Sequence, residues 1–339
     1  MSISTLESFR SALTALPSTN KETASAAAKR DATLTKPAGS LGRLEELAVW
    51  AAGWQGKHPA TLEAPQIAIF AGNHGVCAQG VSAFPAEVTE QMVANFVSGG
   101  AAVNQLANAF GARFSVHPLK LSQPTGDITV TPALSEEEYC EALKIGWATV
   151  QPHSDLLVVG EMGIGNTTIA AALCAALFGG TGSDWAGPGT GVTQEGVSRK
   201  AEVIDQALEK HSAILEDPIS ILQYLGGREI AAMAGAILAA RHQQIPVILD
   251  GFVTCAAAAV LAKANPEALD HCVAGHVSAE PGHILLLRHL GKEPLLDLKM
   301  RLGEGSGAAL AIGILKGALA THTGMASFAE AGVSDGPKT

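Results

Sequence analysis

Apolar positions in the first 58 residues repeat with the spacing of amphipathic helices. Four of them between Leu6 and Leu16 fall on one helical face, and four between Leu44 and Ala51 fall on another. Between these segments, residues 36–42 contain one proline and two glycines and cannot continue a helix. The start of the chain is therefore predicted to be helical, with one turn-forming interruption.

After Pro65 the pattern changes to short β-rich apolar runs that alternate with alanine-rich helical runs. Three such runs, Gln66–Phe70, Leu156–Val159 and Pro246–Leu249, each end in a polar segment that contains glycine. This alternation is typical of a parallel sheet covered by helices. Loops that follow the carboxyl ends of strands line the ligand crevice of such a sheet. The pattern predicts an α/β fold with its site at that edge.

Two further segments bear on the site. Residues 179–196 are rich in Gly and Thr, and we expect them to form a long loop near the crevice without regular structure. Residues 308–320 are apolar almost all round, which is typical of a buried helix. Glu304 is thereby predicted to lie beside the start of a buried helix.

Composition excludes several classes of function. The 339 residues contain 22 Lys+Arg and 32 Asp+Glu, so the formal net charge is −10, and only 4% of residues are aromatic. A nucleic-acid surface needs a basic face and stacking side chains, so we expect no nucleic-acid partner. The longest apolar runs fall short of the ~20 residues that a membrane-spanning helix needs, so no membrane association is expected.

The cysteines and the N-terminus indicate the compartment. Five cysteines without close pairs indicate reduced thiols. Glu7 and Arg10 interrupt the apolar pattern of the N-terminus, which is untypical of a signal peptide. Both observations predict a cytoplasmic protein. The chain length favours about two domains.

The segment Gly160–Thr168 follows a predicted strand and precedes a predicted helix. It has the spacing of a P-loop, but Asn166 stands where the lysine belongs, and Thr168 replaces the third small residue of a dinucleotide fingerprint. Exposed amides of a glycine turn at a helix N-terminus still suit a monophosphate. Alternatively, the glycines only allow the strand and the helix to pack closely.

Two glutamates, Glu161 and Glu304, are flanked by glycines. A carboxylate in such a frame can approach a ligand closely, and apolar walls raise its pKa toward the range of a general base. Each could instead be a carboxylate at a helix N-terminus or on the surface.

A metal site and a serine hydrolase are both disfavoured. His271, Cys272, His276, His283 and His289 lie close in sequence, but their intervals match no common ligand spacing, so we expect no metal. No G-x-S-x-G elbow follows a strand, which disfavours a Ser-His-Asp enzyme.

Six motifs together resemble the nicotinate-nucleotide:dimethylbenzimidazole phosphoribosyltransferase family. They occur in unbroken order at residues 36–45, 73–76, 160–168, 249–252, 276–280 and 301–307. The resemblance runs from about Leu34 to the end of the helix after Gly307.

The resemblance implies a reaction and an architecture. The reaction transfers phosphoribose from nicotinate mononucleotide to 5,6-dimethylbenzimidazole, giving alpha-ribazole 5′-phosphate and nicotinate without a cofactor. The fold would be a Rossmann-like, mostly parallel sheet flanked by helices in residues 63–295, with a small helical domain from residues 1–62 and 296–339. The partners would be these small molecules and a second copy of the chain in a homodimer.

The resemblance also implies catalytic roles. In nicotinate mononucleotide the ring nitrogen is already positively charged, so the glycosidic bond breaks without a metal. The incoming azole must lose its N–H proton, and Glu304 stands at the family's position for the base that takes it. Glu161 matches a second active-site acid, which we assign to the ribose and to the positive charge that develops at C1′.

Phosphate contacts are expected from the amides of Gly163 and Gly303 and from the side chains of Lys200 and Ser278. Taken from its neighbours alone, Lys200 is more typical of a solvated lysine. Asp250 is expected near the ribose, and Asn73 and His74 behind the residues that touch substrate.

The acceptor slot is expected to be formed by Phe84, Met92 and Leu302, a flat apolar surface suited to a methylated bicyclic ring. Some family members carry polar residues at the positions of Phe84 and Met92, so the preferred acceptor stays open. Two other functions also stay open: an N-glycosidase or another mononucleotide-using transferase, and a nucleotide-binding module without catalysis.

Overall fold

In the computed structural model, which describes residues 3–334, six parallel strands form one sheet in the order β2-β1-β3-β4-β5-β6. The strands are β1 (Pro65–Ala71), β2 (Arg113–Pro118), β3 (Leu156–Met162), β4 (Val247–Leu249), β5 (Cys272–His276) and β6 (Pro294–Leu296). The strand order reverses between β1 and β3, which is the switch point where open α/β sheets bind ligands. The Rossmann-like parallel sheet predicted from the sequence is confirmed.

Side chains of the central strands alternate between two apolar layers. In β1, Ala68 and Phe70 belong to one buried cluster, and Ile67 and Ile69 belong to the other. The same alternation holds in β3 and β4. Each strand is thus buried on both faces, and this explains why it is apolar throughout.

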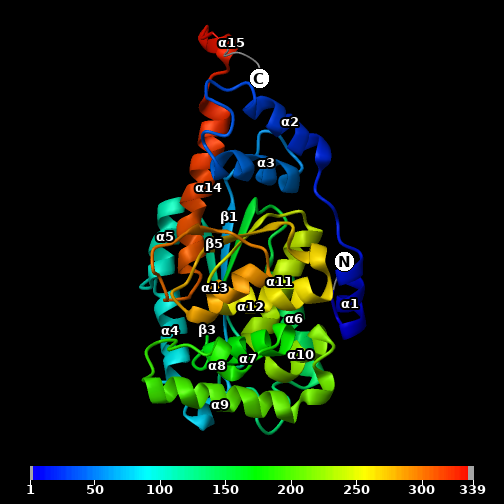
Figure 1. Ribbon diagram of the computed structural model, residues 1–339, viewed down its shortest axis with the longest axis vertical. Coiled ribbons are helices and arrows are strands. Elements are labelled where there is room, and N and C mark those ends of the chain that lie inside the picture. Colours follow the sequence, from blue (N-terminus) through cyan, green and yellow to red (C-terminus); the bar gives the residue numbers. More distant parts are fainter. Residues whose placement is uncertain (1–2, 335–339) are drawn as a thin grey trace.

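Helices cover both faces of the sheet (Figure 1). They are α1 (Leu6–Thr14), α2 (Lys21–Asp31), α3 (Arg43–Gln55), α4 (Glu87–Val97), α5 (Ala102–Phe110), α6 (Glu136–Thr149), α7 (Asn166–Phe178), α8 (Gly182–Trp185), α9 (Gln194–Lys210), α10 (Pro218–Leu225), α11 (Arg228–His242), α12 (Phe252–Ala264), α13 (Pro281–His289), α14 (Ser306–Gly324) and α15 (Phe328–Ala331). Short 3₁₀ turns are η1 (Gly75–Gln79), η2 (Ser212–Ile214) and η3 (Pro266–Leu269). Helices α3, α5 and α14 share one apolar layer, and α6, α7, α11 and α12 share the other.

The two ends of the chain meet at α14. Its apolar face packs against α3 and the sheet, and α2 packs on α3 at the top of Figure 1. Helix α1 lies elsewhere: Phe9 and Leu13 join the opposite apolar layer, and Arg10 pairs with Asp217. The division into residues 1–62 plus 296–339 and residues 63–295 stays a prediction. Residues 1–2 and 335–339 of that small domain lie outside the described residues.

The prediction of an irregular loop over residues 179–196 is wrong in part. Gly182–Trp185 form the short helix α8, and α9 begins at Gln194. Threonines precede both helices: the Thr181 hydroxyl donates to Asp184 Oδ2, and the Thr193 hydroxyl oxygen accepts from the Gly196 amide at 3.3 Å. A glycine-rich and threonine-rich composition therefore concealed two helix starts.

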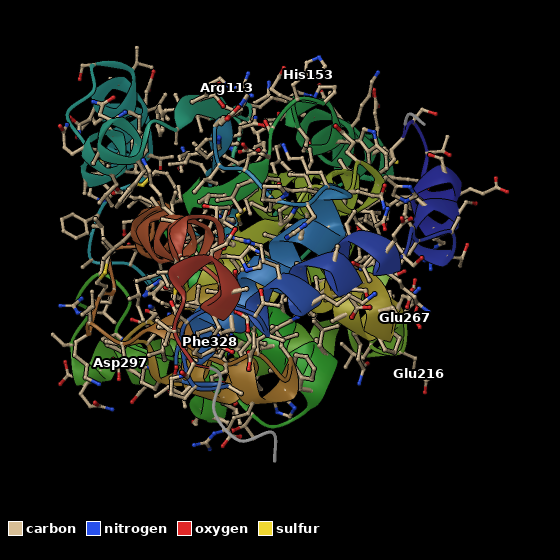
Figure 2. All side chains as sticks on the ribbon, turned by 90° about the horizontal axis from the view of Figure 1, so that it is seen from above. Arg113, His153, Glu216, Glu267, Asp297 and Phe328 are labelled. Carbon is tan, nitrogen blue, oxygen red and sulfur yellow. The ribbon has the colours of Figure 1, made fainter. Side chains whose placement is uncertain are left out.

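Charged side chains such as Arg113, Glu216, Glu267 and Asp297 project from the outer surface, as seen from above in Figure 2. Within residues 3–334, no helix combines the length and the apolar character needed to cross a bilayer.

Candidate active site

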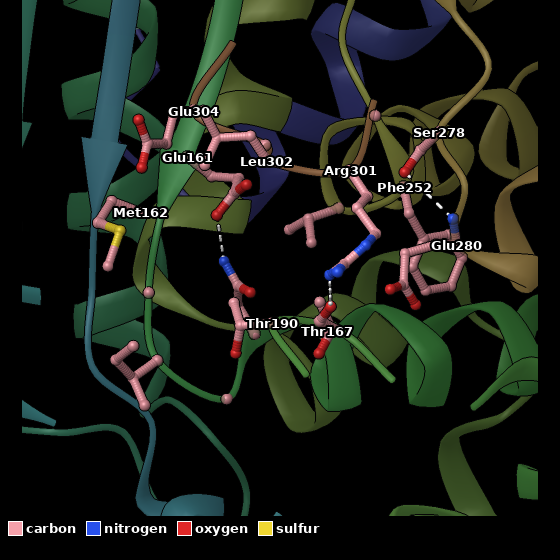
Figure 3. Close-up of a pocket in the computed structure, with 18 of the residues that line it drawn as sticks. Glu161, Met162, Thr167, Thr190, Phe252, Ser278, Glu280, Arg301, Leu302 and Glu304 are labelled. Carbon is pink, nitrogen blue, oxygen red and sulfur yellow. Dashed lines mark hydrogen bonds between the residues drawn. The ribbon is translucent and has the colours of Figure 1, made fainter. Parts of the chain in front are cut away.

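One pocket opens at the carboxyl ends of the strands (Figure 3). Its walls come from the segments that follow β3, β4, β5 and β6, together with residues 81–92 and 189–192. All ten predicted site residues line it: Phe84, Met92, Glu161, Gly163, Lys200, Asp250, Ser278, Leu302, Gly303 and Glu304. Segments more than 200 residues apart in sequence thus contribute to one cavity.

The turn between β3 and α7 forms the floor of the pocket. Gly165 precedes α7 with a left-handed φ of 90°, so the chain turns sharply from Met162 into the helix at Asn166. Gly163 lines the pocket at this point. A glycine turn at the start of a 13-residue helix presents backbone amides and the positive end of the helix dipole, which together suit an anion.

Lys200 on α9 is buried, contrary to the solvated position that its neighbours suggest. Its Nζ donates to Thr167 Oγ1 at 3.0 Å and to the Gly187 carbonyl at 3.1 Å. Burial lowers the pKa of Lys200, and the charge of Glu280 opposes that shift. The pocket therefore holds a cation beside the first turn of α7, where a P-loop would place its own lysine.

Glu161, near the end of β3, is buried and accepts a hydrogen bond from Asn166 Nδ2. Burial raises the pKa of Glu161 to about 8, the amide of Asn166 counteracts this shift, and the carboxylates of Asp250, Glu229 and Glu304 add to it. At neutral pH this group is therefore mostly protonated, and a positive charge that develops on a ligand would favour its carboxylate form.

Glu304 lies in the turn before α14, with a left-handed φ of 60°. The carboxylate of Asp250 fixes this turn by accepting hydrogen bonds from the Gly305 amide at 3.1 Å and the Ala308 amide at 2.9 Å. Burial, together with repulsion by Asp250, raises the pKa of Glu304 to about 7. A carboxylate with this pKa can accept a proton near neutral pH.

The predicted acceptor slot lies at the mouth of the pocket. Phe84 is 47% exposed and Leu302 is 53% exposed, whereas Met92 is half-buried. Apolar side chains left open to water beside a pocket are suited to be covered by a flat apolar ligand.

Ser278, which follows β5, lies deeper in the pocket. Its amide donates to His283 Nδ1 at 2.8 Å, and its hydroxyl oxygen accepts from the Glu280 amide at 3.3 Å. His276 Nε2 lies 3.4 Å from Asp250 Oδ1. The two hydrogen bonds of Ser278 lie within the segment after β5, and His276 brings this part of the chain close to Asp250.

Glu280 and Arg301 also line the pocket and were missed from the sequence. Glu280 is buried, and burial raises its pKa, while Lys200 opposes the shift. Arg301 donates to the Gly189 carbonyl at 3.1 Å. Both residues stand in motifs quoted above, at residues 276–280 and 301–307, so a closer inspection of those motifs could have found them.

Asn73 and His74 do not line the pocket but lie behind it. Asn73 donates to the Leu121 carbonyl at 3.0 Å, and His74 pairs with Glu229. In the described part of the chain, no three His, Cys, Asp or Glu side chains are grouped so that they could hold a metal ion. Of the five clustered residues considered above, His271 bonds to the Ile237 carbonyl and His283 Nδ1 accepts from the Ser278 amide.

The fold and the pocket define a class of protein: an α/β protein whose pocket combines a glycine turn suited to an anion with ionisable carboxylates. Comparison with known proteins narrows this class. A family model described as "Phosphoribosyltransferase" (DBI_PRT) matches residues 16–333, and the chain belongs to this phosphoribosyltransferase family. Its members transfer a pentosyl group.

Curated relatives carry a more specific name. Proteins called nicotinate-nucleotide–dimethylbenzimidazole phosphoribosyltransferase from Ruegeria sp. (strain TM1040) and Ruegeria pomeroyi are each 60% identical, over 98% of this chain and 99% and 98% of their own lengths. A crystal structure of the Thermus thermophilus enzyme with that name has a TM-score of 0.86 at 39% identity, covering 94% of this chain and all of the other. The family resemblance seen in the sequence is confirmed.

Proposed function

We propose that this protein transfers the phosphoribosyl group of nicotinate mononucleotide to 5,6-dimethylbenzimidazole, giving alpha-ribazole 5′-phosphate and nicotinate. One observation carries the proposal: a single pocket combines a glycine turn with a buried lysine, two carboxylates of raised pKa and an open apolar slot. The names of the relatives support the same reaction.

The phosphate of the donor binds at the Gly163 turn. Lys200 supplies the positive charge. The Ser278 side chain and the Gly303 amide donate further hydrogen bonds to the phosphate. Because Lys200 is held by Thr167 and Gly187, its ammonium group is already oriented before the ligand arrives. Such preorganisation reduces the entropy lost on binding.

The chemistry takes place between Glu304 and Glu161. An azole nitrogen attacks C1′ as the C1′–N bond to the pyridinium ring breaks, and the bond electrons neutralise the ring nitrogen of the departing nicotinate. Glu304 takes the N–H proton of the azole, and Glu161 stabilises the positive charge at C1′ and the ribose. Attack from the face opposite the leaving group inverts C1′ and gives the α-riboside.

The acceptor ring covers Phe84, Met92 and Leu302. Since Phe84 and Leu302 are about half exposed, burying them under a flat ring stabilises the complex by roughly 25 cal/mol for each Å² of apolar surface removed from water. Asp250 acts on the ribose from the pocket wall while it holds the Glu304 turn.

Chromatography of the products tests the function. Incubation with nicotinate mononucleotide should release nicotinate only when dimethylbenzimidazole is present, with one riboside phosphate formed for each nicotinate. Release without the azole would indicate an N-glycosidase instead. Binding of the mononucleotide with no turnover under either condition would indicate a module without catalysis.

The protein is expected to act as a homodimer in the cytoplasm. All five cysteines are unpaired, which suits a reducing compartment.

A further inference from the structure

A fully buried histidine–glutamate pair lies behind the Gly163 turn, and no step of the proposed reaction uses it. His74 follows β1, and Glu229 is in the first turn of α11, where the helix dipole favours a carboxylate. His74 Nε2 lies 2.7 Å from Glu229 Oε1, and neither side chain has any exposed surface.

Burying this pair costs free energy. Within the described residues, His74 Nδ1 and Glu229 Oε2 have no hydrogen-bond partner. A buried polar atom without a partner is costly, so a core built for stability alone would favour apolar side chains here. The pair is therefore expected to serve the pocket in front of it.

Three glycines meet the pair at close range. A Cβ placed on Gly163 would lie 3.1 Å from His74 Nε2 and 3.3 Å from Glu229 Oε1. A Cβ on Gly72 would lie 2.4 Å from Glu229 Oε2, and one on Gly227 would lie 2.4 Å from His74 Cε1. The backbone of the pocket turn thus rests directly on the two side chains.

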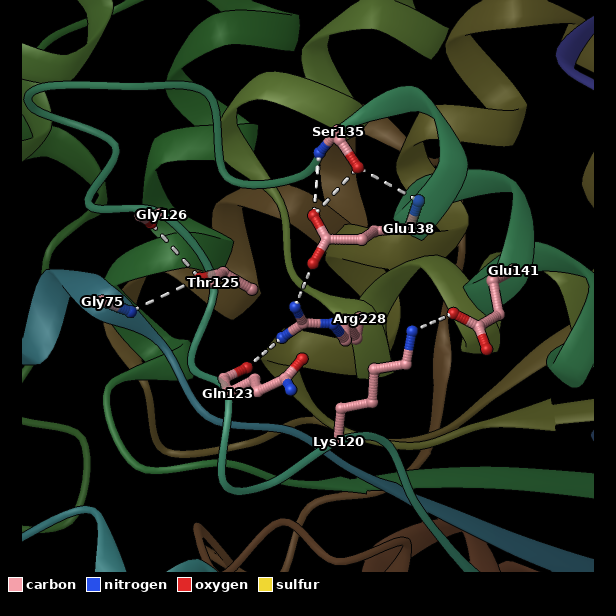
Figure 4. Close-up of polar contacts among 9 residues, drawn as sticks. All are labelled: Gly75, Lys120, Gln123, Thr125, Gly126, Ser135, Glu138, Glu141 and Arg228. Atoms are coloured by element: carbon pink, nitrogen blue, oxygen red, sulfur yellow. Dashed lines mark hydrogen bonds and ion pairs between the residues drawn. The ribbon is translucent and has the colours of Figure 1, made fainter.

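The neighbour of Glu229 in the chain, Arg228, is held by polar contacts with residues 123 and 138 (Figure 4). Arg228 donates to the Gln123 carbonyl at 2.5 Å and to Glu138 Oε1 at 2.5 Å. The segment that contains Gln123 also bonds to the residue before His74, because the Thr125 amide donates to the Asn73 carbonyl at 3.0 Å. Both partners of the pair are therefore anchored to the same surface segment, residues 121–126.

We propose that His74 and Glu229 are positioning residues, which support the Gly163 turn so that its amides face the phosphate of the mononucleotide. Removing the imidazole leaves a void under Gly163, and the turn then settles away from the ligand. The loss should fall on the phosphate and not on the apolar acceptor slot, because Gly163 lies against the pair, whereas Phe84, Met92 and Leu302 belong to other segments. This inference rests on the proposed function.

Calorimetric titration with two donors tests it. Wild-type protein should bind nicotinate mononucleotide more tightly than nicotinate riboside, which lacks the phosphate. In His74→Ala we expect this preference to fall by at least about tenfold. In Glu229→Gln, which keeps the shape but weakens the hydrogen bond, we expect a fall of about threefold. Riboside binding should change little in both variants.

His211→Ala is the matched control. His211 is also buried and bonded, through Nε2 to the Ile128 carbonyl at 2.8 Å, but it does not line or support the pocket. The preference of this variant for nicotinate mononucleotide over nicotinate riboside should equal that of the wild type.

An unchanged preference in a folded His74→Ala protein would overturn the inference, as would an equal loss of affinity for both donors. If His74→Ala does not fold, Glu229→Gln decides in the same way. Wild-type protein that does not distinguish the two donors would contradict the phosphate site of the proposed function itself, so the two failures are distinguishable.

Discussion

At the scale of single residues, the site depends on the close approach of the Gly303 backbone to the Glu161 carboxylate. Gly303 has a left-handed φ of 79°, and a Cβ there would lie 2.4 Å from Glu161 Oε1. A side chain at this position would push the Glu161 carboxylate away from the pocket. The glycine is therefore needed for space as well as for its φ.

Gly303→Ala should reduce kcat/KM by at least about tenfold, because it displaces Glu161. Gly291→Ala is the matched control, since Gly291 has a φ of 60° and nothing within 4 Å of its would-be Cβ. Both variants should lose about 1 kcal/mol of unfolding free energy through backbone strain. Steady-state kinetics and denaturant unfolding separate the two effects. Equal activity of both alanine variants would contradict the proposed crowding.

The sequence predicted candidates that gather in one pocket, but it did not predict the environment of each side chain. Seven of the ten predicted residues lie at the end of a strand or in the segment that follows it, and such segments converge at one sheet edge; Phe84, Met92 and Lys200 reach the same pocket from residues 81–92 and from α9. The burial of Lys200 could not be predicted, since it depends on how α9 packs against the carbonyl of Gly187. Glu280 and Arg301 stand in motifs visible in the sequence, but their proximity to Lys200 and Gly189 arises only in three dimensions.

At the scale of elements, the start of α14 connects the sheet to the catalytic turn. Asp250 after β4 accepts hydrogen bonds from amides in the first turn of a helix more than 50 residues further along the chain. The sequence predicted the helix and placed Glu304 beside it, but it could not show that Asp250 holds that helix start. Local propensity cannot reveal a cap supplied from a distant strand.

Asp250→Ala should destabilise the protein by about 2 kcal/mol, because two buried amides lose their acceptor. It should also lower kcat, because the Glu304 turn is released. Asp217→Ala is the control: Asp217 caps α10 through the Ile219 and Ser220 amides and is remote from the pocket. Asp217→Ala should lose a comparable amount of unfolding free energy, but its kcat should stay normal. Thermal unfolding with parallel assays measures both, and an unaffected kcat in Asp250→Ala would argue against this positioning role.

The segment 179–196 shows the limit of composition at this scale. Its glycines and threonines suggested an irregular loop, yet Thr181 and Thr193 begin α8 and α9. Threonine favours helix starts as well as loops, so the same residues supported both interpretations. The prediction that this segment approaches the crevice holds, because Gly189, Thr190 and Val192 line the pocket.

At the scale of the whole molecule, the prediction to test is the homodimer that the family resemblance implies. A homodimer of two 34.6 kDa chains is expected to sediment as a single species of twice that mass. Sedimentation equilibrium across a wide range of concentrations measures this mass directly. A species that stays at the mass of one chain at all concentrations would exclude the dimer.

The central claim is that Glu304 removes the azole proton in a pocket that holds the phosphate on a glycine turn. Because burial raises the pKa of Glu304 to about 7, the base is protonated below that pH, and kcat/KM should rise with pH through a midpoint near 7. Glu304→Gln keeps the size of the side chain but cannot accept a proton.

The most direct measurement is the rate of riboside phosphate formation by wild type and Glu304→Gln across this pH range, with donor affinity measured in parallel. We predict a fall of at least about a hundredfold in the variant, loss of the limb near pH 7, and little change in donor affinity. A variant that retains the wild-type rate and pH profile would contradict the assignment of Glu304 as the base.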